Sequence, residues 1–237
     1  MSVSFDFEDA VVVVTGAGGA LGSATAEAFS AAGATVCAAD VIDPDDEAHR
    51  LDADITGVST YRVDFTDEGA VESAVDEMVA DHGRIDALVC TAGTWRGGDP
   101  IEETAITVVD LLFDVNVRTA LLAAKYALPH LQETGGSIVT VASQSSLSGG
   151  EGDGPYRASK AAVRLLTESI AAENAGVVRA NAILPDVIDT SANREMMPDA
   201  DFDAWADPAD LASVIRFLCS DAAGPITGAS IPLNGES

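Results

Sequence analysis

The sequence predicts an α/β fold in which a doubly wound parallel sheet of about seven strands lies between layers of helices. Short runs rich in Val, Ile and Ala alternate with longer segments of helical pattern, which is the signature of repeated βαβ units. A glycine-rich turn separates the first apolar run from the first helical segment. With 237 residues and 47% hydrophobic content, the chain is expected to form one domain, residues 1–237, with a sizeable core.

The predicted elements follow one another in a regular order. Pro155 is expected in the first turn of the helix that carries Tyr156, because proline has no N–H to leave unpaired there. The glycine-rich residues 148–154 are expected to form the loop that enters this helix. We expect helices in most of the gaps between the strands, and we place the strands at residues 10–15, 34–39, 59–63, 85–90, 136–142, 177–184 and 230–233.

The charge balance is strongly acidic. The chain has 12 Lys and Arg residues against 39 Asp and Glu residues, a net charge of -27 that is spread along its length. Such a surface keeps a protein in solution, but its extent favours adaptation to high salt, where screening within about 3 Å at molar ionic strength relieves self-repulsion. Nucleic acid and anionic membranes are poor partners, since no basic stripe is present to neutralise phosphates.

The cysteines and the apolar runs indicate the compartment. Cys37, Cys90 and Cys219 lie in apolar segments without C-x-x-C spacing, so they are expected to be reduced core thiols. The sequence contains no signal-peptide pattern and no apolar run of membrane-spanning length, so a cytoplasmic protein is expected. No metal site is predicted.

The glycine-rich turn has the composition and context of a phosphate-binding loop. Its glycines allow the backbone to approach a diphosphate closely, and the following helix presents its N–H groups to that charge. Asp40 ends the second strand, where a carboxylate is placed to accept hydrogen bonds from an adenosine ribose. The turn itself consists of Thr15, Gly16, Ala17, Gly18, Gly19, Ala20, Leu21 and Gly22.

Tyr156 and Lys160 are four residues apart and therefore share one face of a helix. A free phenol has a pKa of about 10, and a nearby ammonium group favours the phenolate. We therefore expect Lys160 to bring the pKa of Tyr156 toward neutrality, as a group that exchanges a proton with a carbonyl or an alcohol requires. The pair alone is a common pattern, and most such pairs only pack on a surface.

Four motifs in order along the chain resemble those of the short-chain dehydrogenases/reductases over nearly the whole length. The turn from Thr15 to Gly22 matches the family pattern T-G-x-x-x-[AG]-x-G, and Asp64 matches the aspartate that contacts adenine. The resemblance implies that Tyr156 is the general acid/base, that Ser143 orients the substrate carbonyl, and that Lys160 holds the nicotinamide ribose and lowers the tyrosine pKa. Asn116, the fourth member of this catalytic tetrad, would anchor a water in the proton relay.

The resemblance also implies the residues that line the cofactor site. They are Thr15, Gly16, Gly18, Gly19, Ala20, Leu21, Gly22, Asp40, Val41, Asp64, Phe65, Ala92, Gly93, Asn116, Tyr156, Lys160, Pro185, Val187, Ile188 and Thr190.

The chain departs from the family pattern at two places. The family's N-N-A-G becomes Cys90-Thr91-Ala92-Gly93, which loses both amides, and we expect cofactor binding to survive. The family's P-G becomes Pro185-Asp186, and Asp186 either points to solvent or repels anionic substrates from the pocket.

Residues 190–206 occupy the place of the family's substrate lid and are short. Their amino-acid sequence is similar to that of the dihydropteridine-reductase branch of this family. The apolar residues of this segment are expected either to line a substrate pocket or to close over the core, and they are Met196, Met197, Phe202 and Trp205.

The sequence thus predicts an oxidoreductase that transfers a hydride between a nicotinamide cofactor and a ketone, aldehyde or secondary alcohol. A 3-oxoacyl-thioester reductase and a dihydropteridine-reductase-like enzyme are the alternatives among enzymes. A nucleotide-sensing binding protein is the alternative from another class. An acidic acyl carrier protein would be repelled by this surface, although salt weakens that objection.

NAD is the expected cofactor, with NADP less favoured, because Asp40 would repel a ribose phosphate and residues 11–49 contain no Lys or Arg. Arg50 is the nearest cation that follows, but Asp45, Asp46 and Glu47 beside it make that position unattractive to a phosphate. Small residues on the helices near 104–131 and 156–173 predict self-association, and the resemblance implies a homotetramer or a homodimer.

Overall fold

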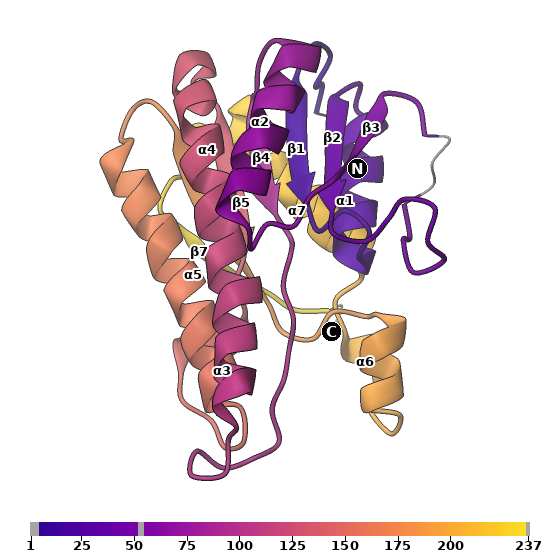
Figure 1. Ribbon diagram of the computed structural model, residues 1–237, viewed down its shortest axis with the longest axis vertical. Coiled ribbons are helices and arrows are strands. Elements are labelled where there is room, and N and C mark those ends of the chain that lie inside the picture. The colour runs from indigo at the N-terminus through magenta and orange to yellow at the C-terminus, as the bar shows by residue number, and fades with distance from the viewer. Residues whose placement is uncertain (1–4, 52–54, 236–237) are drawn as a thin grey trace.

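Seven parallel strands form one sheet in the computed structural model, which describes residues 5–51 and 55–235 (Figure 1). Their order across the sheet is β3-β2-β1-β4-β5-β6-β7, and every neighbouring pair is parallel. The doubly wound fold is confirmed, and strand ends differ from the prediction by no more than two residues. The strands are β1 (Val11–Thr15), β2 (Thr35–Asp40), β3 (Val58–Arg62), β4 (Ala87–Cys90), β5 (Ser137–Val141), β6 (Arg179–Pro185) and β7 (Ser230–Leu233).

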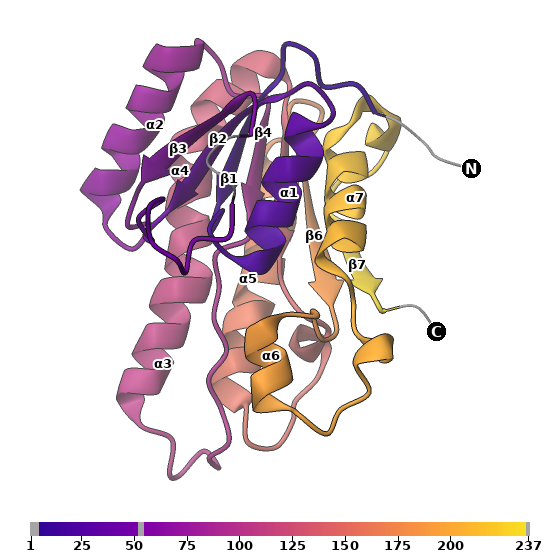
Figure 2. The same cartoon turned by 90° about the vertical axis from the view of Figure 1, so that its right-hand side faces the viewer.

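Helices cover both faces of this sheet. Figure 2 shows α1 and α7 on one side of the strands and α2 and α4 on the other. The described helices are α1 (Ala20–Ser30), α2 (Glu68–His82), α3 (Ile106–Phe113), α4 (Thr119–Thr134), α5 (Gly154–Glu173), α6 (Ser191–Met196) and α7 (Pro208–Cys219). None of them combines the length and the apolar character that crossing a membrane requires.

The valine run of β1 shows why the strands read as continuous apolar segments. All five residues of β1 are buried, because both faces of the sheet are covered. Val12 and Val14 pack in the core beneath α1 and α7, whereas Val11 and Val13 pack in the core beneath α2 and α4. Each side chain of this kind contributes roughly 1.5–3 kcal/mol when it is fully buried.

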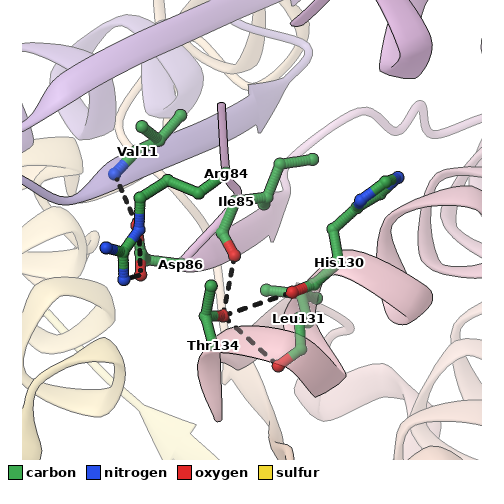
Figure 3. Close-up of polar contacts among 7 residues, drawn as sticks. All are labelled: Val11, Arg84, Ile85, Asp86, His130, Leu131 and Thr134. Carbon is green, nitrogen blue, oxygen red and sulfur yellow. Dashed lines mark hydrogen bonds and ion pairs between the residues drawn. The ribbon is translucent and has the colours of Figure 1, made fainter. Parts of the chain in front are cut away.

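The amino ends of β1 and β4 are joined by polar contacts. Figure 3 shows Asp86 accepting the Val11 N–H at 2.9 Å while it also pairs with Arg84. At the end of α4, the Thr134 hydroxyl donates to the Ile85 carbonyl at 2.8 Å. These contacts fix one edge of the sheet, and the opposite edge, at the carboxyl ends of the strands, carries the predicted functional residues.

The connection from β2 to β3 contains no helix in its described residues, 41–51 and 55–57. The physical reason is that its aspartates bond to main-chain N–H groups two residues further on. Asp40 accepts from Ile42 at 2.9 Å, Asp43 accepts from Asp45 at 3.1 Å, and Asp46 accepts from Ala48 at 2.9 Å. Such turns compete with helix formation, and Pro44 reinforces them.

Candidate active site

The predicted site residues meet at the carboxyl edge of the sheet, where the strand order reverses. β1 lies between β2 and β4, so the chain leaves the sheet in opposite directions on the two sides of this point. In open α/β sheets, the crevice at such a switch point is where ligands bind. Helix α6 lies beyond the carboxyl ends of β6 and β7 (Figure 2).

The glycine-rich turn is built so closely that two of its positions admit only glycine. Gly16 has φ 71°, and a Cβ there would lie 2.7 Å from the Ala92 nitrogen. A Cβ on Gly22 would lie 2.0 Å from the Gly16 carbonyl oxygen. The turn therefore packs directly against the end of β4 and against the first turn of α1.

The start of α1 leaves its N–H groups for a ligand. Gly19 precedes the helix and has no side chain, so no side-chain cap bonds to the first turn. The first N–H groups of a helix lack partners within the helix and attract anions. The turn and the helix start therefore form a cradle that fits the diphosphate of a dinucleotide.

Asp40 lies where the sequence predicted, at the end of β2 beside the turn. Its carboxylate accepts the Gly18 N–H at 2.8 Å, and the residue is only 8% exposed. Asp40 therefore ties the glycine-rich turn to β2 and places a negative charge beside that turn.

The segment after Asp40 also returns to the glycine-rich turn. The sequence did not indicate that His49 would contact this turn. The Arg50 N–H donates to the Gly18 carbonyl at 3.0 Å. A Cβ on Gly18 would lie 2.7 Å from the His49 ring carbon Cδ2, so the imidazole rests against this glycine. The glycine at position 18, which the family pattern does not require, is the one sequence signal for this contact.

On the adenosine side, the remaining predicted residues line the ends of β2, β3 and β4. Val41 is exposed, and Phe65 is buried in the core. Asp64 is exposed and accepts hydrogen bonds from the N–H and the hydroxyl of Thr66, which hold the pKa of that carboxyl below its usual range.

The Cys90-Thr91 departure has a structural explanation. Cys90 is buried in the core between the sheet and its helices, where an asparagine would need hydrogen-bond partners. The Thr91 hydroxyl donates to the Thr15 carbonyl at 2.7 Å. A threonine at this position therefore joins the ends of β1 and β4 without an amide.

Asn116 lies in a π-helical turn, residues Asp114–Arg118, between α3 and α4. Such turns occur often at functional sites. Its amide nitrogen donates to Ser159 Oγ at 2.9 Å and to the Thr94 carbonyl at 3.0 Å, and its oxygen accepts the Thr94 N–H at 2.7 Å. Asn116 thus connects α5 with the segment that follows β4.

Lys160 is buried beneath the site. Its ammonium group donates to the Val141 carbonyl at 2.9 Å, and burial lowers its pKa from 10.5 to about 8. A Cβ on Gly93 would lie 3.0 Å from Lys160 Nζ and 3.2 Å from Asn116 Oδ1. The missing side chain of Gly93 therefore leaves the room that Lys160 Nζ and Asn116 Oδ1 need beside this residue.

Tyr156 lies in the first turn of α5, directly after Pro155, as predicted. The expectation that Lys160 moves its pKa toward neutrality is wrong for this structure, in which the pKa of Tyr156 is raised. Burial is the main cause; the Ser143 hydroxyl lowers the pKa in part, Asp153 raises it and Arg157 lowers it. Lys160 is directed to the Val141 carbonyl instead.

Ser143 follows β5 and is buried beside Tyr156, so the structure brings these two hydroxyl groups together. The Ser143 oxygen accepts the Ser145 N–H at 3.1 Å, which begins a short 3-10 helix and fixes the serine side chain. All four residues of the predicted tetrad are therefore gathered around the carboxyl ends of β4 and β5.

The segment after β6 forms the base of the predicted lid. Asp186 is exposed and its N–H donates to the Leu233 carbonyl at 3.1 Å, which is the solvent-facing alternative of the two expected for it. Ala206 N–H donates to Val187 at 2.8 Å, and Asp189 N–H donates to Ala206 at 2.9 Å. These bonds join the two ends of residues 190–206.

Within that segment, Thr190 accepts the Asn193 N–H at 3.1 Å and so caps α6. Met196 and Met197 are exposed, at 49% and 39%, and neither belongs to the core. The Phe202 and Trp205 rings pack edge to face at 4.8 Å, and Arg194 lies over Phe202. The lid is thus held by its own contacts.

The three cysteines are free thiols. Burial raises the pKa of Cys37 and of Cys90 to about 12 and that of Cys219 to about 11. They are protonated at neutral pH, as expected of thiols in a core. Among the described residues, no group of three or more His, Cys, Asp and Glu residues is arranged to hold a metal ion.

The chain is similar to known proteins over nearly its whole length. A family model described as enoyl-(acyl carrier protein) reductase matches residues 16–235. Meso-2,3-butanediol dehydrogenase of Serratia marcescens is 35% identical over 97% of this chain and 94% of its own length.

Solved structures are also similar to this chain over nearly its whole length. Carveol dehydrogenase of Mycobacterium avium in complex with NAD has a TM-score of 0.85 and 26% identity, covering 97% of this chain and 98% of that one. ElxO with NADP bound has a TM-score of 0.87 and 27% identity, covering 94% and 96%. The chain belongs to the short-chain dehydrogenase/reductase family, and it is an oxidoreductase that acts on alcohols or carbonyl compounds.

Proposed function

We propose that this protein is an NAD-dependent dehydrogenase/reductase that interconverts a secondary alcohol and its carbonyl compound, with Tyr156 as the general acid/base. The observation that carries the proposal is the meeting of the Tyr156 and Ser143 hydroxyls at the carboxyl edge, next to a cradle for a dinucleotide. A hydroxyl pair of this kind binds and protonates one carbonyl oxygen.

The bound cofactor supplies or accepts the hydride. In the reducing direction, Tyr156 donates its proton to the substrate oxygen, and Ser143 orients that oxygen by a hydrogen bond. Lys160, whose ammonium group donates to the Val141 carbonyl, is assigned to hold the nicotinamide ribose. Asn116 keeps α5 and the segment after β4 at a fixed distance.

The preference for NAD rests on Asp40. Its buried carboxylate lies beside the Gly18 N–H, and we assign it to the adenosine ribose, where it would repel a phosphate on that sugar. The remaining contacts to the dinucleotide are assigned to the glycine-rich turn, to Val41, Asp64 and Phe65, and to Ala92 and Gly93. Pro185, Val187, Ile188 and Thr190 would border the nicotinamide carboxamide.

The substrate is proposed to be a small molecule that enters beneath the lid, residues 190–206. Met196 and Met197 are exposed apolar side chains in this segment and are candidates to line the pocket. A reductase of 3-oxoacyl thioesters is a second candidate, because a 3-oxoacyl-[acyl-carrier-protein] reductase of Thermotoga maritima is 31% identical over 96% of this chain.

High salt is the proposed working medium. The six described ion pairs pair twelve charged residues, which leaves most of the 39 acidic residues without such a partner in the described chain. Salt at molar concentration screens the resulting repulsion.

The test is a panel of secondary alcohols, polyols, ketones and acyl thioesters assayed in molar KCl, with NADH absorbance as the readout. We expect turnover with at least one alcohol and its ketone. Turnover confined to acyl thioesters would favour the second candidate. NADH binding without turnover of any member would instead indicate a nucleotide-sensing protein.

A further inference from the structure

The loop that follows β2 connects the glycine-rich turn with the start of α6. The Arg50 N–H bonds to the Gly18 carbonyl at 3.0 Å, which anchors this residue on the glycine-rich turn. Its guanidinium reaches in the other direction and donates to the Ser191 hydroxyl at the start of α6. Residues 141 positions apart in the sequence are thereby joined across the crevice.

Gly18 and Ser191 belong to the two parts of the site between which a dinucleotide must lie. Gly18 belongs to the turn that receives the diphosphate, and Ser191 directly follows Thr190 on the nicotinamide side. Arg50 bonds to the turn through its main chain and to the start of α6 through its side chain, so its guanidinium lies between these two parts of the proposed site.

Arginine is suited to bind a diphosphate in this position. A guanidinium carries five N–H donors in a planar fork, and its bond to Ser191 is its one side-chain hydrogen bond to the described residues. The other donors match two phosphate oxygens at once, in the bidentate geometry that arginine forms with phosphates. In a chain of net charge -27, a cation at the crevice also offsets the repulsion that an anionic cofactor meets.

We propose that Arg50 binds the diphosphate of the cofactor and at the same time holds Ser191, so that cofactor binding fixes the lid helix α6. This inference rests on the proposed dinucleotide site. It differs from a role of Arg50 toward a ribose phosphate, because it concerns the part that NAD and NADP have in common.

The test compares Arg50→Ala with Arg62→Ala in calorimetric titrations with ADP-ribose, NADH, NADPH and adenosine. Arg62 is a matched control, since it is an exposed arginine near the same connection that already pairs with Asp43. We expect Arg50→Ala to weaken ADP-ribose, NADH and NADPH by about 10- to 100-fold, the loss of a charge-assisted hydrogen bond, and to leave adenosine unchanged. Arg62→Ala should change none of them, and Arg50→Lys should restore part of the affinity.

Ser191→Ala separates the lid contact from the phosphate contact. This variant should bind ADP-ribose with a smaller loss than Arg50→Ala. Hydrogen exchange of residues 190–197 should slow on ADP-ribose binding in the wild type, and this protection should be lost in both variants at saturating ligand.

Several results would overturn the proposal. They are unchanged ADP-ribose affinity in Arg50→Ala, a loss for NADPH alone, an equal loss for adenosine, or an equal loss in Ser191→Ala. Failure of the wild type to bind NADH or ADP-ribose would instead refute the dinucleotide site itself.

Discussion

Lys160 donates a hydrogen bond to the Val141 carbonyl at 2.9 Å from a position where only 6% of the residue is exposed. Burial lowers the pKa of this lysine to about 8, because an ammonium group loses its hydration in the core. The site therefore contains a cation that the fold stabilises poorly and that the proposed chemistry uses.

The first prediction concerns the pH dependence of stability. Below about pH 8 the lysine is protonated in both states, and the full cost of burying its charge is present. Between pH 8 and 10.5 the unfolded chain holds the proton and the folded chain releases it, so this cost is removed as pH rises. Relative to Lys160→Met, the wild type should gain about 2 kcal/mol of unfolding free energy between pH 7.5 and 10.

Urea unfolding of both proteins at equal concentration measures this difference. In the unfolded chain the thiols and Tyr156 titrate near the same range, but they are present in both proteins and cancel in the comparison. A parallel pH dependence of the two proteins would contradict a lowered lysine pKa.

The second prediction concerns the proton donor. Tyr156→Phe keeps the ring and should keep the NADH dissociation constant, while turnover should fall by about 10²-fold or more. Tyr126→Phe is the control, because it removes a tyrosine hydroxyl that bonds to Glu68 and that has no part in the proposed proton transfer. Retention of more than about a tenth of the rate by Tyr156→Phe would be incompatible with its role in proton transfer.

The third prediction uses the ion pair beside Tyr156. Asp153 raises the pKa of Tyr156, and Arg157, which pairs with Asp153 at 2.5 Å, lowers it. Asp153→Asn removes the anion and frees the cation, so both changes favour the phenolate. The acidic limb of the kcat/KM profile for alcohol oxidation should therefore move to lower pH, and Ser169→Asn, on the same helix, should leave it in place.

If the acidic limb of the kcat/KM profile moved to higher pH in Asp153→Asn, this limb would report the titration of a group other than Tyr156.

The sequence predicted the sheet because both faces of it are covered, so the apolar runs of β1, β4 and β5 are nearly uninterrupted. The resemblance named the four residues of the tetrad, and of these Ser143 follows the end of β5 while Tyr156 and Lys160 share a face of α5. The absence of a helix after β2 depends on competition between helix formation and aspartate turns, which composition alone does not decide.

Two features of the site could not be derived from the residue pattern. The π-helical turn at Asn116 arises from the contacts of its amide with Thr94 and Ser159, which lie 22 and 43 positions away. The pKa of Tyr156 depends on where Lys160 points, and the i,i+4 spacing fixes only the shared face. Long-range packing determines both.

The fourth prediction concerns self-association. Exposed apolar side chains gather on the helices that were expected to meet a second subunit: Ile106, Leu111 and Phe113 at α3, Leu121 on α4 and Leu165 on α5. Single exposed apolar residues are ordinary, whereas a group of them marks an interface. We expect a dimer or tetramer in molar KCl by light scattering.

Leu165→Glu should shift the mass toward the monomer, because a charge would be buried in the interface. Ser73→Glu adds the same charge on α2 and should not. A wild-type protein that is monomeric in molar salt would exclude this interface.

The fifth prediction is that NADH binds at least about tenfold more tightly than NADPH, through the charge of Asp40. Asp40 accepts N–H bonds from Gly18 and Ile42, so its carboxylate is held in one place beside the glycine-rich turn, at the position proposed for the ribose. Asp40→Asn keeps the shape and one acceptor oxygen but removes the charge. The ratio of the two dissociation constants should therefore fall toward one, mainly because NADPH binds more tightly.

Asp43→Asn is the control, since Asp43 is on the same loop but pairs with Arg62. Titrations at low and molar KCl should give a smaller ratio in salt without reversing it, because screening weakens the repulsion and creates no attraction. Equal or tighter binding of NADPH by the wild type would mean that Asp40 does not face the ribose.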